Sequence, residues 1–169
     1  TTLLIFAVLL IIASISGIAA YFVNRSIRQI EYRILRRYRE KIDKMPALIE
    51  VIRKHTKSDE AYREFLDLHR RAIVSANDRI FDILEINSNI SQRFAFLMRL
   101  ALGIRGMTRD GNFITIRESI TKSEGQIKEL LIEHSRITQL YNSIIKARNA
   151  TLVGIFFPGG KKILVDRMM

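Results

Sequence analysis

Cysteine is absent from this chain of 169 residues, so neither a disulfide nor a thiolate metal site can form. Proline occurs at two distant positions, Pro46 and Pro158, and most of the eight glycines lie in a few places. The long stretches between them can therefore be helical. Alternation of apolar and polar residues, which is typical of strands, does not extend over any useful length. The sequence predicts an all-α fold.

Acidic residues are scarce, because 17 Asp and Glu stand against 28 Lys and Arg, and the net charge is +11. The excess is concentrated directly after residue 23. Lys and Arg close to a membrane segment favour the cytoplasmic side, and each is attracted to anionic lipid by about 1 kcal/mol. We expect the basic collar to contact lipid headgroups through Arg25, Arg28, Arg33, Arg36 and Arg37, with Arg39, Lys41 and Lys44 following.

Charge is missing altogether from residues 1–23, TTLLIFAVLLIIASISGIAAYFV. A membrane hydrocarbon core needs roughly 20 apolar residues in a helix, and only a helix satisfies its own backbone in lipid. The apolar region of a cleaved signal peptide is shorter, about 7–15 residues. Residues 1–23 are therefore predicted to be an uncleaved transmembrane anchor. With the basic collar after it, the prediction is a single-pass inner (cytoplasmic) membrane protein with its N-terminus outside and its helical domain in the cytoplasm.

The remaining residues predict a helical bundle over 24–158 and a basic, apolar tail over 159–169. A first helix continues from the anchor with a coiled-coil-like seam and a kink at Pro46, and it ends near His55. A second begins near Glu60, and its pattern weakens at residues 87–91, where a break is possible. A third has a regular three-four spacing from Ile116 to Ile144. Short turns favour antiparallel neighbours, so we expect three to four long helices in an antiparallel bundle.

The segment from Phe94 to Ile104 is apolar, but it is too short and too charged to span a membrane. The first helix would reach about 48 Å from the bilayer, and an unbroken second helix would run back about 69 Å, which would bring this segment to the surface. Three roles remain open: an interfacial segment, a subunit contact, or ordinary bundle core. The residues that would make an interfacial or oligomer contact are Phe94, Phe96, Leu97, Leu100, Arg93 and Arg99.

Several groups of residues give the chain a resemblance to the LemA family, and together they span nearly its whole length. It departs from the family where LGIRGMTRD precedes the Asn-Phe pair and in the tail. The resemblance implies an N-terminal transmembrane helix and a long antiparallel helical domain on the cytoplasmic side, without accepted catalytic residues. Some members are needed for membrane compartments such as magnetosomes, which implies a membrane-organising role. The residues that carry the resemblance are Arg36-Arg37-Tyr38, Pro46, Leu48, Ile49, Asn112-Phe113, Ser123-Glu124, Ile127, Arg136, Tyr141-Asn142, Asn149 and Phe157-Pro158.

The sequence contains no motif typical of a catalytic or metal-binding site. The three histidines are too scattered for a local metal site, and those on helical seams, His69 and His134, are interpreted as structural. Without a predicted strand, no glycine-rich phosphate loop can follow one. We therefore expect no enzyme activity, no cofactor and no metal. Tyr141 and Asn142 are candidates for a polar lock between helices, with plain packing as the alternative.

The sequence thus predicts a non-enzymatic, membrane-anchored helical scaffold that self-associates and organises membrane or membrane-bound assemblies. Its expected partners are anionic membrane lipids and further copies of itself, because three long helices leave apolar surface uncovered. The alternative is a cytoplasmic adaptor or signalling module that recruits an unknown protein partner to the membrane. Nucleic acid is not expected, because the basic residues cluster at the membrane and the aromatic residues occupy seam positions.

Overall fold

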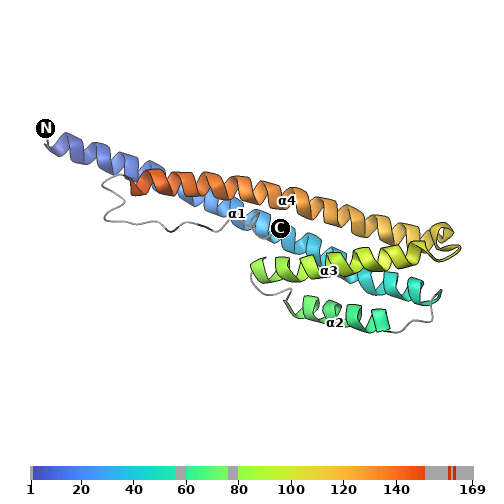
Figure 1. The fold of residues 1–169 in the computed structure, drawn as a ribbon. Coiled ribbons are helices and arrows are strands. Elements are labelled where there is room, and N and C mark those ends of the chain that lie inside the picture. The colour runs from blue at the N-terminus through green and yellow to red at the C-terminus, as the bar shows by residue number, and fades with distance from the viewer. Residues whose placement is uncertain (1, 56–59, 76–79, 151–159, 161, 163–169) are drawn as a thin grey trace. The chain divides into compact units, whose positions relative to one another are not determined.

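The computed structural model describes residues 2–55, 60–75, 80–150, 160 and 162. They form α1 (Thr2–Arg53), α2 (Glu60–Ser75), α3 (Ile80–Leu102), a short 3-10 helix η1 (Met107–Arg109) and α4 (Gly111–Asn149) (Figure 1). None of these residues lies in a strand, so the predicted all-α class is confirmed. The chain divides into two compact units. Unit 1 contains residues 1–32 and 130–167, and unit 2 contains residues 33–129 and 168–169.

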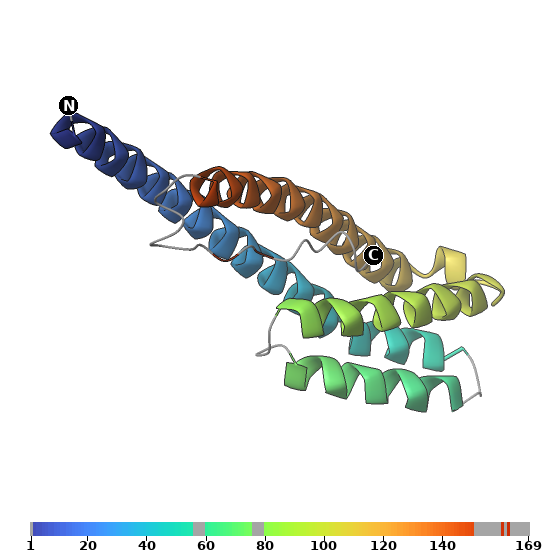
Figure 2. The same ribbon diagram turned by 60° about the vertical axis from the view of Figure 1, so that its left-hand side comes forward.

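Unit 1 pairs the first part of α1 with the last part of α4, side by side and in opposite chain directions (Figures 1 and 2). From α1 it buries Ala20, Ile27 and Ile30. The buried face of α4 drifts off the predicted three-four seam, because a straight helix has 3.6 residues per turn rather than 3.5. Beyond Leu130 the buried positions are Leu131, His134, Ser135, Thr138 and Ile145, whereas Ile137, Tyr141 and Ile144 are half-buried.

Unit 2 combines the second part of α1 with α2, α3, η1 and the first part of α4. The seam predicted on α1 from Tyr38 to Ile52 is buried, while Leu35 is half-buried. Pro46 faces solvent, and α1 continues through it to Arg53. The main buried residues of this part of α1 are Ile34, Tyr38, Ile42, Met45, Leu48, Ile49 and Ile52.

The second predicted helix is in fact two helices, α2 and α3, which pack against each other (Figures 1 and 2). They are separated by residues 76–79, which lie outside the described residues, and α3 is continuous through the predicted break at 87–91. The length of about 69 Å, which holds only for an unbroken helix, therefore does not apply. The break was misplaced because Asn87 and Ser91 do not compete for the helix backbone, but bind Lys41 of α1.

A tight connection joins α3 to α4. Met107 is fully buried and fixes η1 against the core, and Gly106 has the positive φ of 91° that glycine adopts without strain. Asp110 caps α4, because its Oδ1 accepts hydrogen bonds from the backbone N–H groups of Asn112 at 2.9 Å and Phe113 at 3.0 Å. Oδ2 of the same carboxylate lies 3.6 Å from Nε2 of His55, at the end of α1.

The cap at Asp110 makes stability depend on pH. The hydrogen bond from the Phe113 N–H, helped by that from Asn112 and by His55, holds the pKa of Asp110 below its usual value. The cap therefore stabilises the fold above the unfolded-state pKa of about 3.9, and this contribution is lost as pH falls through the lower folded-state value.

We expect Asp110→Ala to lower the melting temperature at neutral pH and to make the melting temperature fall less steeply on acidification. Circular dichroism melts check this; the exposed control Asp43→Ala should change neither, and an equal effect would contradict the cap.

Candidate membrane segment and polar clusters

The predicted anchor segment is helical and turns its apolar side chains outward. By its length and composition, α1 could cross a membrane. Only 11 % of its most apolar stretch is buried inside the fold, whereas the core helix of a soluble protein is mostly buried. Ser14 Oγ donates to the Leu10 carbonyl at 2.8 Å and Ser16 Oγ to the Ala13 carbonyl at 3.0 Å, so these hydroxyls need no water. The exposed large residues are Leu4, Val8, Leu10, Ile11, Ile12, Ile15, Ile18, Tyr21 and Phe22.

Two aromatic residues stand at the C-terminal end of this segment and were missed as a feature of the sequence. Tyr21 and Phe22 are 64 % and 59 % exposed, and their rings meet edge to face at a centroid distance of 5.8 Å. Tyr and related aromatic residues gather at the level of lipid headgroups. The signal was available, because the pair stands at the end of the apolar run, with two residues between Phe22 and the first arginine, Arg25.

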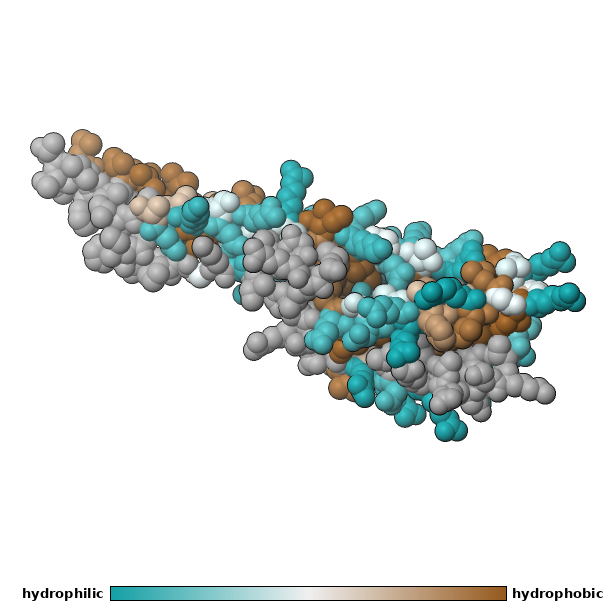
Figure 3. Space-filling view, in the orientation of Figure 1, coloured by the Kyte–Doolittle hydropathy of each residue, from teal (hydrophilic) through white to brown (hydrophobic). Residues whose placement is uncertain are grey.

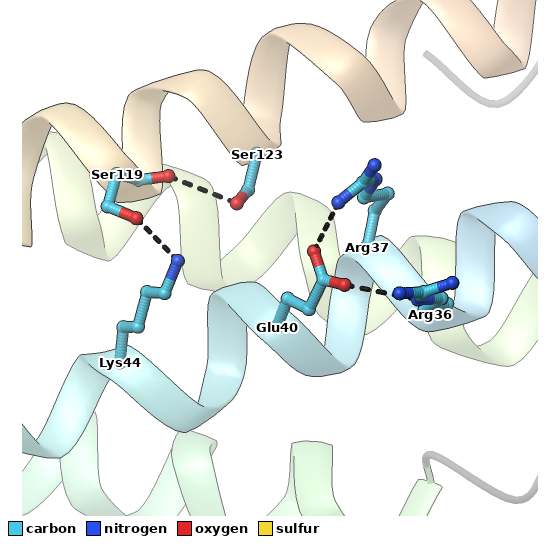
Figure 4. A network of polar contacts seen from close by, with 6 residues as sticks. All are labelled: Arg36, Arg37, Glu40, Lys44, Ser119 and Ser123. Atoms are coloured by element: carbon cyan, nitrogen blue, oxygen red, sulfur yellow. Dashed lines mark hydrogen bonds and ion pairs between the residues drawn. The ribbon is translucent and has the colours of Figure 1, made fainter.

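Of the five arginines predicted to touch headgroups, Arg37 is half-buried and the others are exposed, namely Arg25, Arg28, Arg33 and Arg36. Arg36 and Arg37 both pair with Glu40, at 3.2 Å and 2.6 Å (Figure 4). The hydrogen bond from Arg37 is the main reason that the pKa of Glu40 lies below its usual value. Exposed pairs of this kind contribute little to stability, so they chiefly reduce the net positive charge at this turn.

Lys41 does not belong to the basic collar in which the sequence placed it, because its side chain is 0 % exposed in unit 2. Its three ammonium hydrogens have three acceptors: Asn87 Oδ1 at 2.9 Å, Ser91 Oγ at 2.8 Å and Glu124 Oε1 at 2.8 Å. The Ser91 hydroxyl in turn donates to Glu124 Oε1 at 3.1 Å. This Lys41 cluster joins α1, α3 and α4. Burial lowers the pKa of Lys41 from its usual value, and the Glu124 carboxylate opposes that shift.

A second contact between α1 and α4 in unit 2 lies one turn further along. Lys44 Nζ donates to Ser119 Oγ, and Ser123 Oγ donates to the Ser119 carbonyl at 3.0 Å (Figure 4). Ser123, which occupies the predicted seam, is therefore satisfied by its own helix rather than by another. Residue numbers rise along α1 while those of its partners on α4 fall, from Lys41 with Glu124 to Lys44 with Ser119, so these two parts run antiparallel.

The two seam histidines each bind a different partner. His134 is 2 % exposed, and its Nε2 lies 3.3 Å from Glu31 Oε1 within unit 1. His69 is half-buried in unit 2, with Nε2 3.1 Å from the Ile42 carbonyl. Among the described residues no group of three or more His, Cys, Asp or Glu could hold a metal ion.

The polar seam of unit 1 is less well satisfied than the Lys41 cluster. In unit 1 the buried side-chain atoms without a hydrogen-bond partner in the described chain include Nδ1 of His134, Oγ of Ser135, Oγ1 of Thr138 and Oδ1 of Asn24, and in unit 2 the Tyr38 hydroxyl is another. A buried polar group left unpaired costs about 1–3 kcal/mol, so this helix pair gains less from its packing than its apolar residues suggest.

The segment from Phe94 to Ile104 has a buried and an exposed face. Phe94 and Leu97 belong to the core of unit 2, as do Met98 and Ala101. Phe96 and Leu100 are 44 % and 45 % exposed, and Arg93 and Arg99 are exposed with them. One face is therefore bundle core, and only the other face can contact a membrane or a second subunit.

The position of this segment within unit 2 follows from the contacts of the connection after it. The 3.6 Å contact between His55 and Asp110 puts the α3–α4 connection beside the C-terminal end of α1. Arg33, where α1 enters unit 2, is about 30 Å from Arg53 along the helix. The segment thus lies toward the end of unit 2 that is opposite Arg33.

Tyr141 and Asn142 join α4 to the tail rather than to another helix. Asn142 Nδ2 donates to the Lys162 carbonyl at 2.8 Å, and the Lys162 N–H donates to Asn142 Oδ1 at 2.8 Å. Lys162 Nζ lies 5.7 Å from the centroid of the Tyr141 ring, within the range of a cation–π contact. The hydrogen bonds therefore replace the predicted interhelical lock with a tether to Lys162.

Removing this tether should be measurable by hydrogen exchange. In an Asn142→Ala variant the Lys162 N–H loses its acceptor, so we expect its exchange with solvent to become faster, by about tenfold for the loss of one hydrogen bond. Hydrogen–deuterium exchange read by mass spectrometry at the peptide containing Lys162 checks this. The matched control is Ser143→Ala, because the exposed Ser143 hydroxyl bonds only its own helix, at the Gln139 carbonyl. Unchanged exchange in Asn142→Ala would contradict the tether.

Comparison with known proteins adds no relative, since no family model, no curated protein and no solved structure matches this chain. The resemblance to the LemA family thus stays a prediction from the sequence.

Proposed function

We propose that this protein is a non-enzymatic, membrane-anchored helical scaffold that self-associates and organises membrane or membrane-bound assemblies. The observation that carries the proposal is the anchor segment, whose large apolar side chains are exposed while Ser14 and Ser16 bond their own helix. In water this surface would be costly, whereas lipid would cover it. The resemblance to the LemA family supports the same arrangement, because it implies an anchor followed by a helical domain.

Self-association is supported by apolar residues that face outward beyond the anchor segment. On α4 in unit 1, Ile132 is 68 % exposed, and on α2 in unit 2, Val74 is 75 % exposed. Single exposed residues of this kind are common, but Ile73 and Val74 are consecutive and both exposed near the end of α2, and we propose that a second copy covers this patch of two residues. The topology we propose has the N-terminus outside, residues 1–23 across the membrane and the helical domain after them in the cytoplasm, because the exposed Arg25, Arg28 and Arg33 follow the anchor segment closely.

Two measurements on the full chain test this proposal. Protease applied to intact cells should leave unit 2 uncut, and protease applied to inverted membrane vesicles should cut it; the reverse result would overturn the topology. Mass photometry of the chain in nanodiscs should show more than one copy per disc at low occupancy. A monomer under all lipid conditions would contradict self-association.

The alternative proposal is a cytoplasmic adaptor that recruits an unknown protein partner to the membrane. The patch at Ile73 and Val74 favours it equally, because an apolar surface fits a foreign partner as well as a second copy. Crosslinking in cells through a photoreactive residue at Val74 separates the two. Self-crosslinks as the main product support the scaffold, and a single heterologous product supports the adaptor.

A further inference from the structure

Three segments of unit 2 meet at one end of it and form a surface that the proposed function does not use. They are the C-terminal end of α1, the last turn of α3 and the connection from 103 to 110. The contact between His55 and Asp110, at 3.6 Å, holds the first of these beside the third. We call this the tip surface, and its members are Lys54, Arg99, Leu100, Leu102, Arg105 and Arg109, all of which are exposed.

The tip surface is strongly basic. Between residues 99 and 117 the chain has four arginines and a single acidic residue, Asp110. That carboxylate is already engaged by two backbone N–H groups of α4 and lies beside His55. Buried Met107 anchors the connection between Arg105 and Arg109, so the exposed arginines on either side of it are held on a fixed turn.

Helix dipoles explain only part of this charge. Lys54 and Arg99 lie at the C-terminal ends of α1 and α3, where a positive charge is favourable. Arg105 and Arg109 instead precede the N-terminal end of α4, where the helix already presents positive charge and the first turn has no acidic residue. The Asp110 carboxylate at this end is the one negative charge beside these two arginines, and it is already engaged by the N–H groups of Asn112 and Phe113.

Exposed leucines accompany these arginines. Leu100 is 45 % and Leu102 is 49 % exposed, while Ala101 between them is fully buried. Figure 3 shows hydrophobic and hydrophilic side chains next to one another in unit 2. A surface that combines basic residues with apolar side chains suits the interface of an anionic membrane, where the first meet headgroups and the second enter the acyl boundary.

We propose that the tip surface is a second lipid-binding site, which takes an anionic membrane surface independently of the anchor segment and the basic collar. A nucleic acid would satisfy the arginines equally, but it would leave Leu100 and Leu102 in water. The Phe113 ring on α4 is fully buried and presents no face on which a base could stack, and the exposed ring of Phe96 lies one turn before Leu100 on α3, where it adds to the apolar side chains. An anionic bilayer satisfies both kinds of side chain.

The test places the full chain in nanodiscs of neutral phosphatidylcholine, so that its own disc offers the tip surface little attraction. Vesicles containing phosphatidylserine are then added in excess, and bound discs are measured by flotation. The wild type should bind these vesicles in preference to pure phosphatidylcholine vesicles. Arg105→Gln with Arg109→Gln should lower the partition coefficient by about 30-fold, since each arginine contributes about 1 kcal/mol near an anionic surface.

Two further variants separate the apolar contribution from general charge. Leu100→Ser with Leu102→Ser should also lower binding, because it removes the side chains that enter the bilayer. The matched charge control is Arg63→Gln with Arg70→Gln, two exposed residues of α2 in the same unit. This control should bind nearly as the wild type does, and circular dichroism should show unchanged helix content in all variants.

Three results would overturn the proposal. Equal loss in the tip and α2 arginine variants would mean that the attraction is diffuse. Full binding by the leucine variant, with competition by a DNA duplex, would assign the surface to nucleic acid. Loss only in Arg25→Gln with Arg28→Gln would place all lipid contact in the collar, which contradicts the tip surface but leaves the proposed scaffold intact.

Discussion

Replacement of Glu124 by leucine is expected to lower the free energy of unfolding by about 3 kcal/mol, at the lower end of what breaking a buried ion pair costs. The lower end applies because the Glu124 side chain is 25 % exposed, whereas Lys41 is 0 % exposed. Without Glu124 the ammonium keeps only Asn87 and Ser91 as acceptors and has no counter-charge. Guanidinium unfolding of the detergent-solubilised chain, followed by circular dichroism, measures the loss.

The partner variants determine whether the loss comes from a stranded charge. Lys41→Met removes the ammonium and keeps an unbranched chain of similar length, so it should cost less than Glu124→Leu. The double variant should be more stable than the sum of the single losses implies, by about 1–3 kcal/mol of coupling for residues in direct contact. Glu118→Leu, an exposed glutamate on the same helix, is the matched control. A loss in Glu124→Leu no larger than in this control would show that Lys41 is solvated.

Charge placed in the anchor segment should remove the protein from membranes. Ile11 and Ile15 are 57 % and 62 % exposed one turn apart on α1, at the middle of the apolar run. A charged residue at the centre of a membrane helix costs about 3 kcal/mol on insertion scales, so Ile11→Arg with Ile15→Arg should reduce the inserted fraction by several orders of magnitude. Extraction of cell membranes with alkaline carbonate measures this fraction.

The control for this prediction keeps the charge but moves it out of the apolar run. Tyr32 is 68 % exposed at the end of the collar, and Tyr32→Arg should leave the protein in the carbonate-resistant fraction. Retention of the Ile11→Arg, Ile15→Arg variant in that fraction would show that contacts other than the anchor segment hold the protein to the membrane.

The parts of the fold that follow from a simple apolar period could be predicted from the sequence. The buried side of α1 at Ile42, Met45 and Ile49 has this period, and α4, from Gly111 to Asn149, contains the whole spacing predicted from Ile116 to Ile144. The helix over the uncharged run was equally predictable, because a run of this length and composition favours a continuous helix.

The hairpin of α2 and α3 was not predictable in this way, because its stability depends on contacts that are remote in the chain. Asn87 and Ser91 are read as helix breakers when only local sequence is considered, yet they are ligands of an ammonium group 46 and 50 residues earlier. Lys41 was assigned to the basic collar by its neighbours, although its spacing from Tyr38 and Met45 places it on the buried seam. Periodicity gives the position of a residue on a helix, but not which partner satisfies it.

All three N–H groups of the Lys41 ammonium have an acceptor, and this restrains the movement of α1 along its axis as well as stabilising the fold. Each residue of axial slip moves a helix by about 1.5 Å, enough to take Nζ out of reach of acceptors now 2.8–2.9 Å away. Sliding of α1 past α3 and α4 therefore costs free energy from its first step, because even a slip of one residue breaks these contacts. Tension applied along α1 would accordingly be borne by unit 2 as a stiff body until the charge pair separates in one cooperative event.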